Sequence, residues 1–225
     1  QSGASEIRAL NDVSLAVNPG EFVAVMGPSG CGKSTLLHLA GGLEPLTAGD
    51  VRFDGRSITD MGAAEVAELR RRHIGYVFQQ LNLIPSLTAL ENVALPLELN
   101  GVTARRARDE ARTRLAAVGL DRSLDRYPDD FSGGQQQRIA IARATIGERR
   151  LVLADEPTGA LDTSTADQVI DLLAGFARAG TAVVLVTHEP RFAAWADRVI
   201  FLRDGKVVDE SAPFASAADT TRGGS

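Results

Sequence analysis

The sequence is poor in cysteine and in aromatic side chains. It has one cysteine and one tryptophan, and aromatic residues make up only 5% of its 225 residues. The single thiol, Cys31, can form no disulfide within the chain, so we expect an intracellular protein. No cluster of cysteine and histidine residues has metal-ligand spacing, which argues against a zinc module. The core must be built from Val, Leu, Ile and Ala, because hydrophobic residues still amount to 44%.

Long apolar runs and excess positive charge are also missing. The longest runs, such as residues 182–186, are far shorter than the roughly 20 residues of a membrane-spanning helix. The net charge of −5 offers no general attraction to nucleic acid, so we expect no nucleic-acid partner. Residues 1–5 lack the order of a signal peptide, and the chain opens on Gln1, so we expect it to begin partway into its gene product.

The order of apolar patterns predicts an α/β fold. The first third mixes strands and helices, and in the last third apolar strands alternate with helices, which favours a parallel sheet covered by helices. The expected strands are residues 13–17, 22–26, 51–53, 74–78, 151–154 and 182–186, with a hairpin at Asp204–Gly205, and the expected helices are 61–72, 103–118, 135–146, 166–176 and 192–197.

Domain organisation follows from where the strand pattern stops. We predict a single domain over residues 1–225, with an α/β core formed by residues 1–78 and 150–210. Residues 79–149 show helical spacing only and are expected to form an inserted helical subdomain. Residues 211–225, rich in Ala, Ser, Thr and Gly, are expected to be a flexible tail.

A phosphate loop stands between the expected strand 22–26 and a helix beginning near Lys33. The segment GPSGCGKST matches the pattern G-x-x-x-x-G-K-[ST] in its required context. Glycines allow backbone N–H groups to point at a β-phosphate, Lys33 adds positive charge, and the helix N-terminus adds its dipole. A glycine-rich turn without a ligand would not need Lys33 and Ser34 in sequence. The expected nucleotide-binding residues are Gly27, Pro28, Ser29, Gly30, Cys31, Gly32, Lys33, Ser34 and Thr35, with Ser34 also a Mg²⁺ ligand.

Cys31 has two interpretations within this loop. The simpler one is a small spacer, which we favour over a redox role. Because Lys33 and a helix N-terminus both lower the pKa of a nearby thiol, we also expect Cys31 to be a reactive probe of nucleotide occupancy.

A buried-type strand, LVLAD, ends in the two carboxylates of Asp155 and Glu156. Such an arrangement is costly unless a cation or ligand compensates the charge. Alternation along the strand points the two side chains in opposite directions, so we expect different roles. Asp155 suits Mg²⁺, and Glu156 suits activation of a water for attack on a γ-phosphate. The alternative is that both acids only cap the next turn.

Two more polar residues follow strands. Gln79 comes after the strand 74–78, and His188 after the strand 182–186. Because ligands gather at the carboxyl ends of strands in open α/β sheets, both could reach the same nucleotide. Gln79 offers an amide to Mg²⁺ or water, His188 can hydrogen-bond a γ-phosphate, and Gln80 remains an alternative to Gln79.

The segment FSGGQQQR, residues 131–138, resembles the signature motif LSGGQ of ATP-binding-cassette (ABC) ATPases. Together with the phosphate loop, Gln79, LVLADE and His188 in the same order, the resemblance covers essentially the whole chain. It implies a P-loop NTPase core with a mostly parallel sheet, an N-terminal antiparallel β subdomain and an inserted helical subdomain. Physically, Ser132 as a helix cap followed by two glycines makes a second anion site.

The resemblance also implies how the protein acts. Two chains, as a homodimer or pseudo-dimer, would sandwich two Mg·ATP, with Ser132, Gly133, Gly134 and Gln135 of each completing the site of the other. Asp162 would couple the two sites across the interface. ATP hydrolysis would power an integral membrane permease or a related force-transmitting complex, with the ATPase bound peripherally at the cytoplasmic face of the inner membrane.

Within the family, residues 82–93 resemble the branch that serves macrolide export, lipoprotein release and antimicrobial-peptide resistance. The helical subdomain would then form the cleft for an amphipathic coupling helix of the membrane subunit. Three departures stand out: Phe131 replaces Leu, Ala160 replaces Ser, and residues 1–10 lack the aromatic that stacks on adenine. We expect that aromatic to precede Gln1; otherwise adenine is held in another way.

Other classes explain the sequence less well. A DNA-maintenance ABC ATPase would carry a long coiled coil between Lys33 and Ser132, where no sustained heptads occur. A GTPase or small-molecule kinase would leave the signature motif and His188 unexplained. The arginines of residues 105–114 are interpreted as a solvated helix face. A signalling complex that transports nothing shares every residue discussed and remains open.

Overall fold

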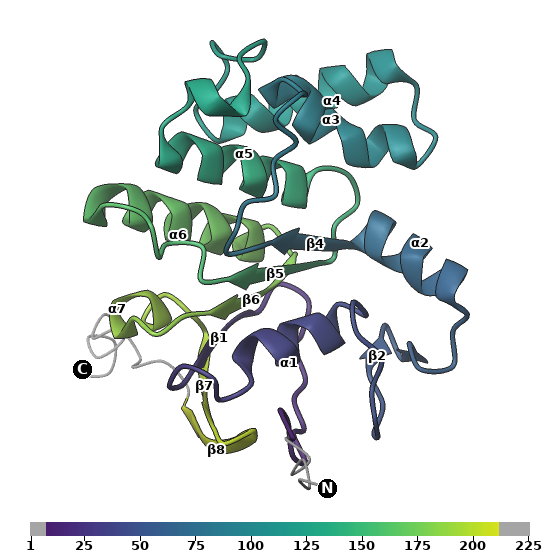
Figure 1. The fold of residues 1–225 in the computed structure, drawn as a ribbon, viewed down its shortest axis with the longest axis vertical. Helices are drawn as coiled ribbons and strands as arrows, with labels where there is room; N and C mark the ends of the chain where they lie inside the picture. The colour runs from purple at the N-terminus through teal and green to yellow at the C-terminus, as the bar shows by residue number, and fades with distance from the viewer. Residues whose placement is uncertain (1–7, 212–225) are drawn as a thin grey trace, which may run out of the picture.

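The structure is a computed structural model that describes residues 8–211, so the expected tail lies outside the described residues except for Ser211. Figure 1 shows the arrangement of the elements. In chain order these are β1 (Phe22–Met26), α1 (Lys33–Ala40), β2 (Arg52–Phe53), β3 (Arg56–Ser57), α2 (Ala63–His73), β4 (Ile74–Val77), α3 (Ala89–Leu99), α4 (Ala104–Ala117), a 3₁₀ turn η1 (Pro128–Asp130), α5 (Gly133–Thr145), β5 (Leu151–Asp155), α6 (Thr163–Arg178), β6 (Ala182–Val186), α7 (Pro190–Ala193), β7 (Arg198–Arg203) and β8 (Lys206–Ser211).

The main sheet has six strands in the order β4-β5-β6-β1-β7-β8. All neighbouring pairs are parallel except β7 with β8, which form an antiparallel hairpin. Every residue of β1 and β6 is buried, as expected for aliphatic strands covered on both faces. The hairpin turns at Asp204, whose φ of 48° is left-handed, and Gly205. The predicted parallel α/β sheet is confirmed.

Helices cover both faces of this sheet. In Figure 1, α6 lies above the sheet and α1 below it, while α3, α4 and α5 form the top of the molecule. One apolar core contains Phe22, Ile170 and Leu173 between the sheet and α6, and another contains Leu37 and Leu153 on the α1 side. The carboxyl ends of the parallel strands therefore meet at a single edge, where ligands bind in such folds.

Residues 79–149 contain helices and no strand. They enclose a third apolar core, to which Val93, Leu115 and Ile139 belong, so α3, α4 and α5 hold together by their own packing. Thr88 caps α3, and its hydroxyl accepts a hydrogen bond from the Glu91 N–H at 3.2 Å. Arg143 of α5 donates to the Leu81 and Asn82 carbonyls at 2.7 and 2.6 Å, which fixes the loop after Gln79 onto this helical layer.

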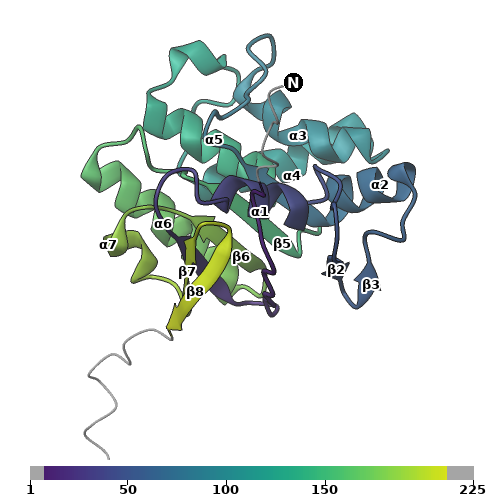
Figure 2. The ribbon, with the colours of Figure 1, turned by 60° about the horizontal axis from the view of Figure 1, so that its bottom comes forward.

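The expected antiparallel β subdomain is present, but one expectation about the N-terminal part needs correction. Residues 13–17 form no strand, although Val13, Leu15 and Val17 pack against the core on the α1 side. The neighbouring strand β1 is already paired on both edges, with β6 and β7, so this segment cannot join it there. Within the described residues, the separate antiparallel sheet consists only of β2 and β3, which Figure 2 shows apart from the main sheet.

Several other predicted elements differ from the observed ones at their ends. The helix expected over residues 192–197 is observed as α7 at Pro190–Ala193, where Pro190 suits the first helical turn. The strand expected over 151–154 extends through Asp155. Among residues 8–211, no helix combines the length and apolarity needed to cross a membrane.

Candidate functional site

The phosphate loop joins the end of β1 to the start of α1, as predicted. A Cβ on Gly27 would lie 2.1 Å from the Leu202 carbonyl oxygen, so only glycine fits there. Gly32 has a left-handed φ of 105° and caps α1 without a side-chain hydrogen bond. The first intrahelical bond runs from the Leu36 N–H to the Gly32 carbonyl. The first-turn N–H groups of α1 therefore remain available to an anion.

Lys33 is buried at the base of this loop. Its ammonium group donates to the Gly27 and Pro28 carbonyls, each at 2.9 Å. These two hydrogen bonds compensate for the burial of the positive charge inside the loop. Ser34, one residue on, is exposed.

The surroundings of Cys31 differ from those that a reactive thiol needs. Its side chain is 5% exposed and belongs to the apolar core on the α1 side, next to Gly27. Buried thiols in apolar surroundings are inert, so the expectation of a reactive thiol is wrong, and the spacer interpretation fits.

The two carboxylates at the end of β5 have different surroundings. Asp155 is 7% exposed, and its Oδ1 has no hydrogen-bond partner among the described residues. Glu156 leaves the strand in a left-handed conformation, with φ of 46°, while its N–H still donates to the Val186 carbonyl at 3.0 Å. Its Oε2 lies 2.6 Å from Nδ1 of His188. The sheet therefore brings His188, from the end of β6, directly against Glu156.

A cleft of about 540 Å³ opens at this edge of the sheet. Most of the predicted phosphate-loop residues line it, joined by Gln79 after β4 and Glu156 after β5. Gln80 is not among the lining residues, and neither are Gly27, Pro28 and Cys31, which form the frame of the loop. Four lining residues were not predicted from the sequence: Arg8, Ala9, Asp204 and Gly205. The DG turn was visible in the sequence, but its position at the cleft was not.

The candidate signature segment lies at the start of α5. Ser132 is the N-cap, its hydroxyl accepts from the Gln135 N–H at 3.4 Å, and the Gln135 side chain accepts from the Ser132 N–H at 3.1 Å. A Cβ on Gly133 would meet nothing within 4 Å, whereas one on Gly134 would lie 2.2 Å from Thr165 Cγ2. None of Ser132 to Gln135 lines the cleft of its own chain.

Asp162 caps α6 beside this segment. Its carboxylate accepts hydrogen bonds from the Thr165 N–H at 3.0 Å and the Thr165 hydroxyl at 2.7 Å. These bonds, the hydroxyl one first, hold the pKa of Asp162 below its ordinary value. Thr165 thus binds Asp162, and its methyl group fills the space that a side chain at Gly134 would need. The two predicted interface segments are therefore packed together.

Comparison with known proteins identifies the family. The family model described as "ABC transporter" matches residues 10–159. The chain belongs to the ABC transporter family. It is 43% identical, with a TM-score of 0.86, to the ATP-binding cassette MJ0796 in a dimeric post-hydrolysis state bound to ADP and Pi, and covers 94% of each chain. It is an ABC ATPase with the corresponding P-loop fold.

Two curated relatives differ in length. The macrolide export ATP-binding/permease protein MacB 1/2 of Paracoccus denitrificans is 45% identical over 97% of this chain, which spans only 33% of that relative. The uncharacterized ABC transporter ATP-binding protein YknY of Bacillus subtilis is 43% identical over 94% of this chain and 92% of its own. The resemblance to the macrolide-export branch is confirmed at the level of sequence similarity.

Proposed function

We propose that this ABC ATPase powers a membrane transporter or a related force-transmitting complex, in which ATP closes a dimer and hydrolysis reopens it. The observation that carries the proposal is the cleft itself. It brings the phosphate loop, Gln79 and Glu156 to one sheet edge, beside a buried Asp155 with an unpartnered oxygen.

The phosphate loop holds the triphosphate of ATP. Residues Gly27, Pro28, Ser29, Gly30, Cys31, Gly32, Lys33, Ser34 and Thr35 shape it or turn N–H groups toward the phosphates. Lys33 exchanges its two carbonyl acceptors for phosphate oxygens when nucleotide enters. The exchange requires only a short movement of the ammonium group, because those carbonyls belong to the same loop.

The residues around Asp155 fit a magnesium ion. Carboxylate, hydroxyl and amide oxygens are ligands that Mg²⁺ accepts, and the buried Oδ1 of Asp155 lacks any other partner among the described residues. Ser34, Gln79 and Asp155 would hold the ion, Asp155 through its water shell. A bound Mg²⁺ neutralises charge on the β- and γ-phosphates.

Glu156 is the general base. It accepts a proton from a water as the water oxygen bonds to the γ-phosphorus and the bond to the leaving ADP oxygen breaks. His188 holds the Glu156 carboxylate in position through the 2.6 Å contact and hydrogen-bonds the γ-phosphate. Gln79 positions the same water from the neighbouring strand end.

The partner subunits follow from the segments that do not line their own cleft. Ser132, Gly133, Gly134 and Gln135 complete the nucleotide site of a second ATPase copy or a paralogous one, and Asp162 couples the two sites. A permease is the second partner, because the macrolide export relative carries a permease part beyond the region matched here. The ATPase would then lie at the cytoplasmic face of the cell's inner membrane, bound through residues 79–149.

The test is the oligomeric state of the Glu156→Gln protein, measured by light scattering with and without Mg·ATP. Removing the base should trap ATP and shift monomer to dimer. Glu148→Gln, an exposed acid elsewhere, should show no trapped dimer. Adding Lys33→Ala to Glu156→Gln should abolish ATP binding and the shift. Demonstrated ATP binding with no shift would overturn ATP-driven dimerisation of this chain.

A further inference from the structure

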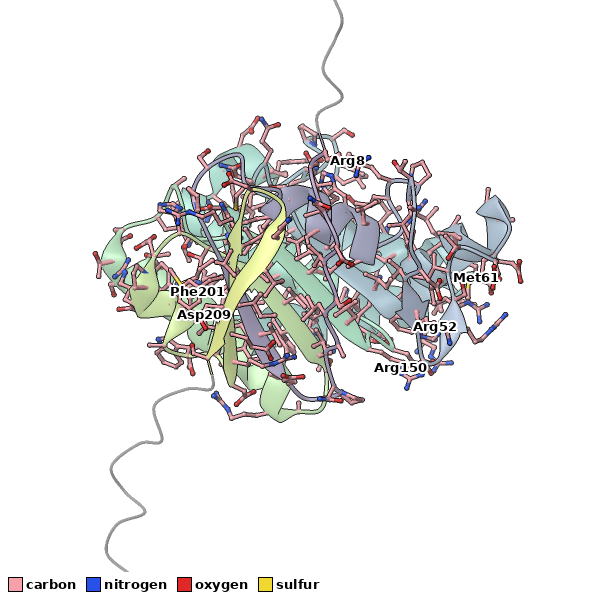
Figure 3. The ribbon with its side chains drawn as sticks, turned by 90° about the horizontal axis from the view of Figure 1, so that it is seen from below. Arg8, Arg52, Met61, Arg150, Phe201 and Asp209 are labelled. Carbon is pink, nitrogen blue, oxygen red and sulfur yellow. The ribbon has the colours of Figure 1, made fainter. Side chains whose placement is uncertain are left out.

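Two buried polar atoms without a hydrogen-bond partner belong to neighbouring strands of the main sheet. Among the described residues, the Tyr76 hydroxyl of β4 and Oδ1 of Asp155 in β5 both lack a partner. Tyr76 is paired in register with Leu153, and Asp155 is two residues beyond Leu153 on the same strand. Because successive side chains of a strand alternate between faces, all three residues share one face, and a diagonal neighbour is within reach of an aromatic side chain. Figure 3 views the molecule from the α1 side and shows Arg150, just before β5, well away from Asp209 of β8.

The Tyr76 ring is held between β4 and α1. It packs with Leu153 against the apolar core on the α1 side. Its centroid lies 4.1 Å from that of the stacked Phe78 ring and 5.9 Å from that of His38 in α1. A Cβ on Gly41, at the end of α1, would lie 3.5 Å from Tyr76 Cε2. The ring is therefore fixed under the helix that begins at the phosphate loop.

The electrostatics of the phenol connect it with Asp155. Burial raises the pKa of Tyr76 above its ordinary value, and the charges of Asp155 and then Glu44 raise it further. Tyr76 therefore keeps its proton at neutral pH and remains a hydrogen-bond donor. Of the two acids, Glu44 is already engaged, because its Oε1 lies 2.9 Å from Nδ1 of His38. The acid with a free buried acceptor is Asp155.

We propose that Tyr76 is a positioning residue for Asp155: its hydroxyl donates a hydrogen bond to the Asp155 carboxylate, directly or through one water, and holds that carboxylate in place for Mg²⁺. The inference rests on the proposed function, since that function assigns Asp155 to the ion. Carboxylates that serve a metal ion are themselves held by hydrogen bonds from a surrounding shell, and loss of such a bond lowers metal affinity about 10- to 100-fold.

The test separates binding that depends on the metal from binding that does not. The affinity for ADP, which is not hydrolysed, is measured by calorimetry on the full chain, once with excess Mg²⁺ and once with EDTA. Tyr76→Phe removes only the hydroxyl and keeps the ring against α1. It should weaken ADP binding about tenfold in Mg²⁺ and leave binding in EDTA unchanged within about twofold. A loss of packing alone would weaken both.

The chain offers a matched control and a second variant. Tyr127, the other of its two tyrosines, is 50% exposed, and Tyr127→Phe should change neither affinity. Asp155→Asn removes the charge that serves the ion, so it should weaken ADP binding in Mg²⁺ and not in EDTA. Adding Tyr76→Phe to Asp155→Asn should cause no further loss, because Tyr76 acts through Asp155.

The outcomes separate this inference from the proposed function. If Asp155→Asn loses the effect of Mg²⁺ but Tyr76→Phe keeps it, the role of Tyr76 is overturned and the magnesium site is retained. Equal weakening by Tyr76→Phe with and without Mg²⁺, or a further loss in the double variant, would also overturn the inference. If Asp155→Asn keeps the full effect of Mg²⁺, the proposed magnesium site is wrong, and the role of Tyr76 is overturned with it.

Discussion

At the scale of single residues, two acids that are adjacent in the sequence have different surroundings. Asp155 and Glu156 are adjacent acids, yet the first is buried with an unpartnered oxygen and the second reaches the cleft beside His188. The left-handed φ of 46° at Glu156 turns the chain at the point where the strand ends. Such a conformation costs about 1–3 kcal/mol in a residue other than glycine, and it places the proposed base at the nucleotide.

At the same scale, Asp50 should titrate unusually low. Its carboxylate accepts hydrogen bonds from the Ser57 and Thr59 hydroxyls at 2.6 and 2.5 Å and from Arg52, which lowers its pKa from 3.8 to about 2. Because the folded pKa is depressed, the stabilisation by Asp50 is present above pH 4 and is lost as the pH falls toward 2. An NMR titration of the Asp50 carboxyl carbon should give the midpoint.

Removing the Ser57 hydroxyl tests the cause of the low Asp50 pKa. Ser57→Ala removes the largest cause of the shift, so the midpoint should rise toward 3.8, whereas the remote Ser86→Ala should leave it near 2. A midpoint near 3.8 in the unmodified protein would contradict the prediction.

Elements are joined in this fold by side chains that bond to helix and strand ends. Arg149 precedes β5 and donates to the carbonyls of Arg70, Arg71 and Ile74, at 3.1, 2.7 and 3.1 Å, and to the Ile146 carbonyl at 3.0 Å. It therefore ties together the ends of α2 and α5 and the start of β4. Burial lowers its pKa to about 10, so it remains charged at neutral pH.

Removing this joint should destabilise the whole domain. Arg149→Ala removes four hydrogen bonds. The Arg70 and Arg71 carbonyls keep donors in the Ile74 N–H and the Asn100 side-chain amide, and any buried carbonyl left without a donor costs about 1–3 kcal/mol when no water replaces the bond. We expect Arg149→Ala to lower the thermal midpoint by several degrees. Arg150→Ala, which alters an exposed arginine paired with Asp54, is the control and should change it little. Equal thermal midpoints for the two variants would show that the hydrogen bonds of Arg149 do not stabilise the domain.

At the scale of the whole molecule, the two proposed phosphate-binding segments lie apart in one chain. The phosphate loop opens into the cleft, whereas Ser132 at the start of α5 lies outside the lining of that cleft. A helix N-terminus with an exposed Gly133 invites phosphate, so a second copy is the natural source of the missing contact. The related cassette MJ0796 is indeed described as dimeric.

This arrangement predicts a separation of binding from turnover. Ser132→Arg should leave ATP binding to the monomer unchanged within about twofold, because Ser132 is absent from the cleft. It should lower ATPase activity by at least tenfold, because the arginine occupies the face that meets the partner's nucleotide. The comparison variant is Ser123→Arg, in the loop after α4, which should retain activity. Normal turnover by Ser132→Arg would argue against a site completed in trans.

Much of the fold was predictable because its signals are local. β1 and β6 were predicted with their observed ends, since continuous runs of Val and Ala bounded by turn residues specify buried strands. The phosphate loop was equally clear, because its chemistry is contained in nine consecutive residues. The same reasoning failed for residues 13–17, whose side chains alternate as expected but whose backbone joins no strand of the sheet.

The sequence alone therefore determined the family, the phosphate loop and the order of the elements, because each depends on neighbours along the chain. Tertiary structure decided which distant segments share the cleft. It selected Gln79 rather than Gln80 as a lining residue and buried Cys31. It also brought Arg8 and Asp204, which are far apart in the sequence, to the same cleft. Those outcomes depend on strand order and on parallel direction, which place strand ends together whatever their separation in sequence.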